Sequence, residues 1–551
     1  MKKRESRLFS VHGGSGAKRF FTICLALVFA ACILAGCGKG GSQTSGAGTT
    51  QTAGGLPIVT SPLTLTFFME MDAKATVTMK DYSEIKFVKE WEKRTGITIE
   101  WRHPLTGQAA DQFNLMLASG DYPDIIYYGM SGVPGGGAKL LDDGVIIKLN
   151  DLMEKNAPNF MKLMQNPQWK RDSILDDGSY YGFPYIREHE SELITSAFQM
   201  RKDWLDKLGL QIPTTIDEWY KVLSAFKREN VNGQGNVIPY VAIGNSTFNT
   251  FYNFAQAYGI KAVKGTNKFY KDGNTVKFGP AQPAYRDFLT EMNKWYSEGL
   301  LDSEYLLTDD KSFASKITGH QGGAYFGMVL GYMGVYTDLL RPDNPDFEVT
   351  AVPFPLGPAG KAYGQKDINV NQNYAMVTTK CKNPVEAVRM LDYLYGEEGN
   401  LLANFGIEGE SYNMVNGEPI YTDMIFHNPL PLTTALMQYA WSVSTGPMIQ
   451  DGRFFLQVLV YPEQKRAVEI WGGSCDPSLN LPPLSQTPTE VQRLAAISND
   501  LETYVDEMSN RFIMGLEPLG NFDRYINALQ SMNVNEAVAL YQTALERYNK
   551  R

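Results

Sequence analysis

Histidine and cysteine are scarce in this chain, which has five of each among 551 residues. No histidine pair has HExxH spacing, no serine lies in a GxSxG elbow, and no two cysteines form a CxxC pair. The Gly-Lys step at 360–361 continues with alanine, so it lacks the hydroxyl residue of a phosphate-binding loop. The Glu-His-Glu cluster at 188–190 is more typical of a solvated turn than of an acid–base pair. Nothing in the sequence therefore demands an enzyme.

Positive charge and long apolar runs are also lacking once the N-terminal segment is set aside. Residues 37–551 carry 45 basic against 59 acidic side chains, a net charge of −14. This balance disfavours nucleic acid as a partner and a polybasic grip on a membrane. No later run is long enough to span a bilayer without charge. The length that remains is enough for two or more lobes.

The N-terminal residues predict export followed by lipid anchoring. Six basic residues precede an apolar run at 20–36, as in a signal peptide. This run ends in Leu-Ala-Gly-Cys37, which resembles the bacterial lipobox, whose cysteine thiol accepts a diacylglyceryl group. Residues 38–55 contain mainly Gly, Ser, Thr, Ala and Gln, a composition typical of a flexible coil. We predict a signal peptide over 1–36, lipid on Cys37, and a tether to residue 55, with an uncleaved anchor helix as the alternative.

Strand and helix patterns alternate along the rest of the chain. Residues 63–69 read as a strand, residues 85–94 as a helix ended by Gly96, and residues 97–101 as a second strand. Such a unit predicts a parallel pair with a right-handed crossover. Other predicted elements are strands at 124–128 and 349–352, and helices at 111–119, 215–226, 284–298, 384–395 and from 489 onward. The alternation predicts an α/β protein.

Several motifs, taken in order, resemble those of extracellular solute-binding proteins of family 1, the receptors of ABC importers for sugars. Within this family the chain resembles the long Gram-positive lipoproteins of the LipO type, whose relatives bind oligosaccharides. The motifs are MLASGDYPDII at 116–126, GVIIKLNDL at 144–152, WLDKLGL at 204–210, PTTIDEW at 213–219, KCKNP at 380–384 and FGIEGESY at 405–412. The resemblance implies a two-lobed, periplasmic-binding-protein-like α/β fold of type II, with the ligand cleft between the lobes.

The resemblance also implies how the chain is divided and what it does. The N-terminal lobe would comprise residues 56–185 and 366–430, and the C-terminal lobe residues 186–365 and 431–551. The chain would cross between lobes near 181–190, 353–367 and 429–435. A captured oligosaccharide would close the hinge, and permease subunits of the importer would read the closed form. The protein would be a monomer on the extracellular face, held to the membrane through Cys37, with no cofactor and no catalysis.

Sugar recognition needs aromatic faces and planar polar groups, so we expect both at strand ends and loops of the cleft. For each such residue, packing in a core or in a solvated loop is an equally good interpretation. Trp441 and Tyr181 are the strongest candidates. The predicted ligand-binding residues are Glu70, Asp72, Tyr128, Tyr181, Tyr185, Tyr325, Glu410, Trp441 and Trp471.

The sequence also bears on metal binding, uronate binding and disulfide formation. Relatives often carry an acidic calcium loop after the helix at 215–226, but here residues 229–239 have lost nearly all the acids, so we predict a weak or absent calcium site. Arg102 and Arg187 are weak candidates to hold a uronate sugar. Cys381 and Cys475 could form one disulfide. A surface carbohydrate-active enzyme and a partner that presents ligand to a membrane sensor are the alternative functions.

Overall fold

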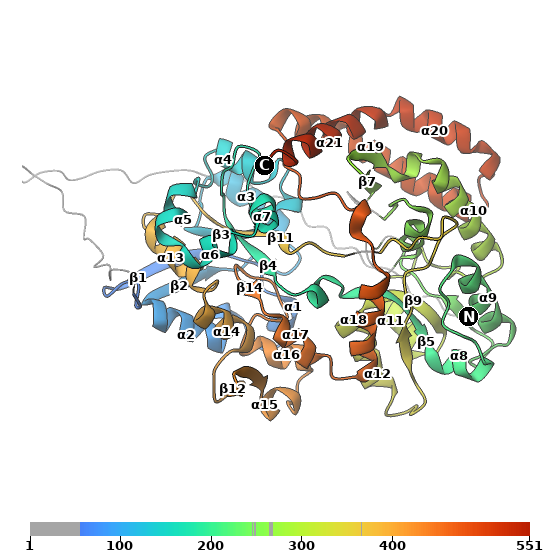
Figure 1. Ribbon diagram of the computed structural model, residues 1–551, viewed down its shortest axis with the longest axis horizontal. Helices are drawn as coiled ribbons and strands as arrows, with labels where there is room; N and C mark the ends of the chain where they lie inside the picture. The colour runs from blue at the N-terminus through green and yellow to red at the C-terminus, as the bar shows by residue number, and fades with distance from the viewer. Residues whose placement is uncertain (1–54, 245, 247–249, 264–267, 365) are drawn as a thin grey trace, which may run out of the picture. The chain divides into compact units, whose positions relative to one another are not determined.

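A computed structural model describes residues 55–244, 246, 250–263, 268–364 and 366–551 (Figure 1). The predicted signal peptide, Cys37 and all but the last residue of the predicted tether lie outside these described residues. Within the described residues, no helix combines the length and the apolar character that a membrane crossing requires. The strands form two main sheets that share no strand, so the described chain has two lobes, each built around its own sheet.

The first lobe contains a six-stranded sheet with the order β14-β4-β11-β3-β1-β2. Strand β1 is parallel to both β2 and β3, whereas β11 is antiparallel to β3 and β4. Asn373 of β11 pairs with Gly129 of β3, so β11 begins at the edge where β3 and β1 end. The strands are β1 (Leu63–Phe68), β2 (Ile97–Arg102), β3 (Ile125–Gly129), β4 (Phe183–Arg187), β11 (Val370–Val377) and β14 (Ile449–Gln450).

The sequence accounts for the β1–α2–β2 unit at the beginning of the first lobe. Leu65 and Phe67 are fully buried on one face of β1. Helix α2 (Lys86–Thr95) buries Phe87, Val88 and Trp91, and Gly96 ends it with a φ of 76°. The predicted strand–helix–strand unit is therefore confirmed, with β1 and β2 in parallel register. Asp81 and Glu84 form a capping box on the short 3₁₀ turn η1 (Tyr82–Glu84), which lies ahead of α2.

Short helices and one hairpin complete the first lobe. Most of these short elements lie along residues 103–181 and 383–440. The hairpin consists of β12 (Tyr412–Val415) and β13 (Glu418–Tyr421). The other elements are α1 (Ala73–Thr76), α3 (Ala109–Ser119), η2 (Met130–Gly132), α4 (Gly136–Asp142), α5 (Asn150–Asn156), α6 (Pro158–Leu163), α7 (Pro167–Ser173), α13 (Pro384–Tyr393), α14 (Glu397–Phe405), α15 (Asp423–Phe426) and α16 (Leu432–Met437).

The second lobe contains a four-stranded sheet with the order β10-β5-β9-β6. Its strands are β5 (Ser196–Arg201), β6 (Ile238–Tyr240), β9 (Gly322–Met328) and β10 (Val349–Ala351), and β7 (Phe269–Asp272) pairs with β8 (Thr275–Phe278). Thr215 caps α9 by accepting the Glu218 backbone N–H at 3.2 Å, which confirms the predicted helix there. The helices are α8 (Lys202–Leu208), α9 (Ile216–Arg228), η4 (Phe251–Tyr258), η6 (Gly279–Ala281), α10 (Pro283–Ser297), α11 (Asp310–Thr318), η7 (Val329–Gly334), α12 (Val335–Leu340), α17 (Gly452–Val458), α18 (Pro462–Ser474), η8 (Pro477–Leu479), α19 (Pro488–Ile513), η9 (Leu519–Asn521), α20 (Phe522–Ser531) and α21 (Val534–Tyr548).

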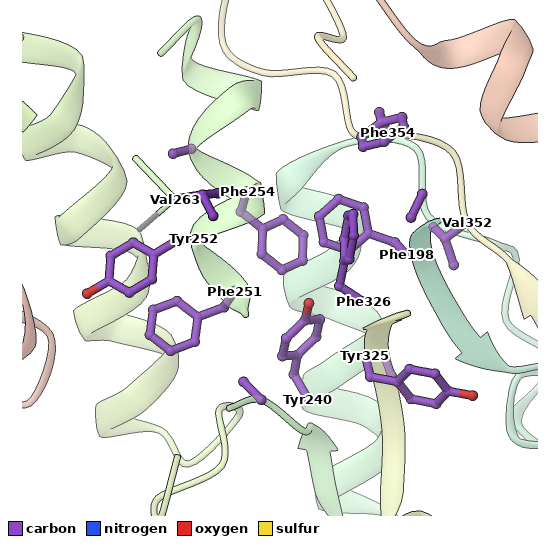
Figure 2. Packing of buried hydrophobic residues seen from close by; sticks show 14 of the residues in the cluster. Phe198, Tyr240, Phe251, Tyr252, Phe254, Val263, Tyr325, Phe326, Val352 and Phe354 are labelled. Carbon is purple, nitrogen blue, oxygen red and sulfur yellow. The ribbon is translucent and has the colours of Figure 1, made fainter. Parts of the chain in front are cut away.

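Aromatic rings make up much of the core of the second lobe. Figure 2 shows the rings of Phe198, Phe254 and Phe326 gathered beside the sheet. The Phe198 ring lies 4.4 Å from that of Phe254 and 5.2 Å from that of Phe326. Tyr325 precedes Phe326 on β9 and points to the other face of the strand, as alternation along a strand requires (Figure 2).

The chain passes between the two sheets three times. It leaves the first sheet after β4, returns before β11, and leaves again after β14. The first two passages lie side by side, because the Asp367 backbone N–H donates to the Leu193 carbonyl at 2.9 Å. The sequence placed the third passage near 429–435, but β14 still pairs with β4, so residues 431–450 stay in the first lobe. A strand of two residues leaves too short a pattern for the sequence to reveal.

The C-terminal helix forms a further connection between the lobes. Helices α19 and α21 pack together near the end of the chain, drawn in red in Figure 1. From α21, Arg547 donates to Asp176 at 2.8 Å, and the Tyr548 hydroxyl donates to Asp172 at 2.5 Å. Asp172 belongs to α7, which packs against β11 of the first sheet. Charged and polar contacts therefore tie α21 to the first lobe.

Candidate functional site

A polar cavity of about 250 Å³ lies where β1 and β3 end. We call it the strand-end cavity. Open α/β sheets place their ligands at the carboxyl ends of parallel strands, and the cavity occupies that edge. Its lining residues are Met69, Glu70, Met71, Asp72, Ala109, Tyr127, Tyr128, Gly129, Asn373, Ser444 and Thr445. Three of the sequence-predicted residues, Glu70, Asp72 and Tyr128, thus lie together here.

Asp72 organises the loop that follows β1. Its carboxylate caps α1 by accepting the Lys74 backbone N–H at 2.8 Å, and it also pairs with the Lys74 ammonium. Its other oxygen accepts the Ser444 hydroxyl at 2.9 Å, which ties this loop to the segment before β14. The Tyr82 hydroxyl accepts the Asp72 backbone N–H at 2.8 Å. Asp72 therefore fixes the shape of the cavity wall as well as its charge.

Glu70 is the exposed carboxylate of the strand-end cavity. One of its oxygens, Oε1, accepts the Gly107 backbone N–H at 3.0 Å. An ionised carboxylate offers about four acceptor sites, so acceptor capacity remains for hydroxyl groups of a ligand. Tyr128 adds a half-buried ring that is stacked on Phe113 with centroids 4.1 Å apart. Burial raises the pKa of Tyr128, so its hydroxyl stays protonated at neutral pH and can donate.

A second cavity, of about 460 Å³, lies between residues of the first sheet and residues of the second lobe. We call it the inter-sheet cavity. Met130 and Gln372 line it, and their chain neighbours Gly129 and Asn373 line the strand-end cavity, so the two share a wall. From the second lobe it is lined by Lys261, Phe269, Asn480, Leu481, Pro482, Pro483, Leu484, Ser485, Gln486, Val491, Tyr541 and Arg551.

Tyr181, predicted from the sequence, lines the inter-sheet cavity. It is 4% exposed, and its ring lies 4.4 Å from that of Tyr374. Gly137 allows this position, because a Cβ there would approach the ring to 2.4 Å. Helix α4 can therefore lie directly against Tyr181, and only a small part of the ring remains available to a ligand.

The remaining predicted residues do not line either cavity. Trp441 and Trp471 are fully buried in the cores of the first and second lobes, and Tyr185 and Tyr325 are each 1% exposed. The Trp471 indole N–H donates to the Phe198 carbonyl at 3.2 Å. Glu410 is half-buried and pairs with Lys86 at 2.7 Å. In this structure the four aromatic residues act as packing residues, and none presents an open ring face.

Both arginines considered for a uronate already have carboxylate partners. Arg102 is 3.5 Å from Asp121 at the surface. Arg187 pairs with Asp367 and lies 5.7 Å above the Tyr185 ring, so it ties the first passage between the sheets to the second. Cys381 and Cys475 are both free thiols.

Sequence reasoning did not identify several lining residues. Asn373, Ser444 and Thr445 reach the strand-end cavity only because β11 and the segment before β14 return to the first sheet. Such long-range pairing leaves no local pattern. Lys261 did leave a signal, since it is a single charge inside the apolar run from Tyr258 to Val263. A charge in such a run indicates a buried ionisable group.

The loop at 229–239 is closed by its own amide side chains. Asn230 Oδ1 accepts the Gly235 backbone N–H at 2.8 Å, and Asn232 Oδ1 accepts that of Gln234 at 3.0 Å. The Asn232 amide also donates to Asn236 Oδ1 at 2.8 Å. Oxygens that would have to coordinate calcium therefore already accept hydrogen bonds. No cluster of three or more His, Cys, Asp or Glu side chains suited to a metal occurs in the part of the chain that the structure describes.

We therefore expect calorimetric titration with calcium to give no binding in the micromolar range. Calcium needs several oxygen ligands with carboxylates among them, and Glu229 is the only acid in this loop. Thermal unfolding should also be unchanged between calcium and a chelator. A micromolar midpoint, or a calcium-dependent rise in melting temperature, would contradict the prediction.

A larger cavity of about 950 Å³ adjoins this loop at the far end of β5. The Arg201 guanidinium lies between the rings of Trp204 and Phe347, 4.7 Å from each centroid. Its Nε donates to Asp203 at 2.7 Å. Arg201 is thus held by packing and by an ion pair, which favours a structural role.

Comparison with known proteins places the chain among solute-binding proteins. The sequence profile of the bacterial extracellular solute-binding protein family matches residues 76–401. The chain is 25% identical over 501 residues to the fructooligosaccharide ABC transporter substrate-binding protein FusA of Streptococcus pneumoniae serotype 4, covering 87% of this chain and 90% of the relative. It is 23% identical over 423 residues to lipoprotein LipO of Bacillus subtilis, covering 73% and 76%.

A solved structure supports the fold. The alginate-binding protein AlgQ2, solved without calcium ion, matches with a TM-score of 0.71 and 24% identity. The match covers 89% of this chain and 99% of that chain. It confirms the predicted two-lobed α/β architecture.

Proposed function

The chain belongs to the bacterial extracellular solute-binding protein family, and we propose that it captures an oligosaccharide for an ABC importer. The strand-end cavity carries this proposal. It gathers an exposed carboxylate, an amide, hydroxyls and a tyrosine ring at the sheet edge where α/β proteins bind ligands. The name of the relative FusA, a fructooligosaccharide-binding protein, agrees with this class of ligand.

The chemistry of the cavity suits a sugar. Hydroxyl groups donate and accept, so they pair well with Glu70, Asn373 and Ser444. Hydrogen bonds to a charged acceptor are worth about 1.5–3 kcal/mol each, which makes Glu70 the strongest single partner. The adjoining inter-sheet cavity extends the available space into the second lobe, as a ligand of several sugar units requires.

Closure of the two lobes on the ligand would couple capture to delivery. A ligand that contacts both lobes favours the closed arrangement, because only that arrangement supplies both sets of contacts. The passages at 188–195 and 352–369 run side by side and would act as the hinge. Permease subunits of the importer would then recognise the closed form, with the protein acting as a monomer and without a cofactor.

We also propose that lipid on Cys37 holds the protein on the extracellular face of the cytoplasmic membrane. The lipobox sequence and the basic and apolar segments before it support this. The relative LipO is named a lipoprotein, which agrees. The lipid would keep the lobes close to the importer.

Replacing Glu70 by glutamine is expected to weaken binding of the cognate oligosaccharide about 10-fold, because a charged hydrogen bond becomes a neutral one. Calorimetry against a panel of neutral and acidic oligosaccharides measures this. Glu410→Gln is the matched control, since Glu410 is also a glutamate of the first lobe but lies outside both cavities. It should bind like the parent protein.

The same titrations separate the alternatives. Absence of binding to every oligosaccharide would contradict the proposal, and equal losses in the two variants would remove Glu70 from the site. Chromatography of each ligand after incubation tests for an enzyme, because new products would show turnover. Uptake assays in cells lacking the protein test transport against a role confined to a membrane sensor.

A further inference from the structure

Lys261 is a cation held in a buried segment at the wall of the inter-sheet cavity. It follows η4 and stands between Ile260 and Ala262, which are each 2% exposed. The residue itself is 9% exposed. Its backbone is closely packed, because a Cβ at Gly279 would come within 1.8 Å of the Lys261 carbonyl oxygen. The side chain therefore extends from a fixed backbone into the cavity that it lines.

The ammonium of Lys261 has a neutral partner. It donates to Asn480 Oδ1 at 2.8 Å, and no carboxylate among the described residues lies within 4.0 Å of it. Burial lowers the pKa of Lys261 to about 8, and Asp367 opposes this only in part. An ammonium in such surroundings loses hydration that an amide oxygen does not fully replace.

The other charges along this cavity already have partners. Lys366 pairs with Glu190, Arg551 with Asp176, and Asp367 with Arg187. Asp172 accepts hydrogen bonds from Tyr548 and from Gln168. Of the three cations described along the cavity, Lys261 is thus the one without a carboxylate at ion-pair distance.

We infer that the inter-sheet cavity takes an oligosaccharide bearing a carboxylate, as in a uronic acid unit, and that Lys261 pairs with that group. The inference rests on the proposed function and specifies its ligand. A carboxylate would restore the electrostatic stabilisation that burial removes from the ammonium. Neutral sugar hydroxyls would offer only further neutral acceptors, like the one that Asn480 supplies.

The lining of the cavity suits such a sugar in other respects. Side-chain amides and a hydroxyl from both lobes surround it, namely Gln372, Asn480, Gln486 and Ser131. They can pair with the ring hydroxyls while Lys261 selects the acid. The global net charge of −14 after the signal segment does not oppose this, because a buried charge at contact distance acts far more strongly than screened surface charges.

A pair of ligands that differ only in charge provides the test. The purified protein is titrated with trigalacturonate and with its methyl ester, and likewise with trimannuronate and its ester. At least one acid should bind about 10-fold or more tightly than its ester, since the ester has the same skeleton without the charge. Lys261→Met should abolish this preference by weakening binding of the acid far more than binding of the ester, and Lys261→Arg should retain it.

Each other result has a definite meaning. Esters that bind as well as acids, or neutral oligosaccharides that bind while both acids fail, overturn the inference but leave the proposed function standing. A Lys261→Met variant that weakens acid and ester equally shows a structural role through Asn480, which also overturns it. Failure of every neutral and acidic oligosaccharide to bind contradicts the proposed function itself. Thermal unfolding of each variant confirms that it is folded.

Discussion

Replacing Trp441 by alanine is expected to lower the free energy of unfolding by about 4 kcal/mol. Trp441 is fully buried, and its ring lies 4.7 Å from Phe87, 5.5 Å from Tyr82 and 6.1 Å from Trp101. The segment after it closes tightly, since a Cβ at Gly446 would lie 2.5 Å from the indole. Alanine would leave a large cavity that these rings cannot fill. Urea unfolding followed by circular dichroism measures the loss.

The Trp441→Phe variant separates packing from ligand stacking. It keeps an aromatic ring in the cluster and should cost about 1.5 kcal/mol. If the indole serves only to pack the core, this variant binds oligosaccharide with the affinity of the parent protein. A loss of affinity of about 10-fold or more without a larger loss of stability would show that the ring contacts the ligand. That result would restore the stacking role suggested by the sequence.

The elements that the sequence predicted best are helices with a local signal at their start. The helix predicted at 215–226 appears as α9, because the Thr215 cap and the buried stripe agree. The helices predicted at 284–298 and 384–395 appear as α10 and α13, each begun by a proline in its first turn. The sequence did not predict strand β14. Two residues are too few to show the alternating pattern of a strand, and their pairing with β4 joins segments far apart in sequence.

The candidate site was predictable only where it follows a strand directly. Glu70 and Asp72 come after β1, and Tyr128 is near the end of β3, so the strand pattern alone brings them to one edge. Trp441 and Trp471 could not be assigned in the same way. A tryptophan can have the same local sequence pattern in a core as in a cleft, and only the packing of α2 and β2 around Trp441 decides.

Glu192 is a buried carboxylate in the first passage between the sheets, within η3 (Glu190–Leu193). The residue is 1% exposed, and its Oε2 accepts the His189 backbone N–H at 3.0 Å. Burial raises the pKa of Glu192 to about 8, while that hydrogen bond and Arg187 oppose the rise and Asp451 and Glu188 add to it. At neutral pH the folded protein therefore holds this group mostly protonated.

Because the pKa of Glu192 is raised in the folded state, the direction in which pH changes the free energy of unfolding is fixed. The folded protein binds the proton more tightly than the unfolded chain, whose pKa for this group is near 4.5. The stabilisation is complete below that value and is lost as the pH rises to about 8. We expect Glu192→Gln to match the parent protein at pH near 5, and to be more stable by about 3 kcal/mol at pH near 9.

Urea unfolding of both proteins at the two pH values measures this difference in the free energy of unfolding. The contributions of other titrating groups cancel in the difference, because both proteins share those groups. Glu190→Gln is the matched control, since Glu190 lies in the same turn with 71% of its side chain exposed and pairs with Lys366. Its stability should follow that of the parent at both pH values. If the free energy of unfolding changes with pH in the same way for Glu192→Gln and the parent, Glu192 is already ionised at neutral pH in the folded protein. Divergence that grows from pH near 5 to pH near 8 would instead show that ionisation of this carboxylate destabilises the passage that we propose as part of the hinge.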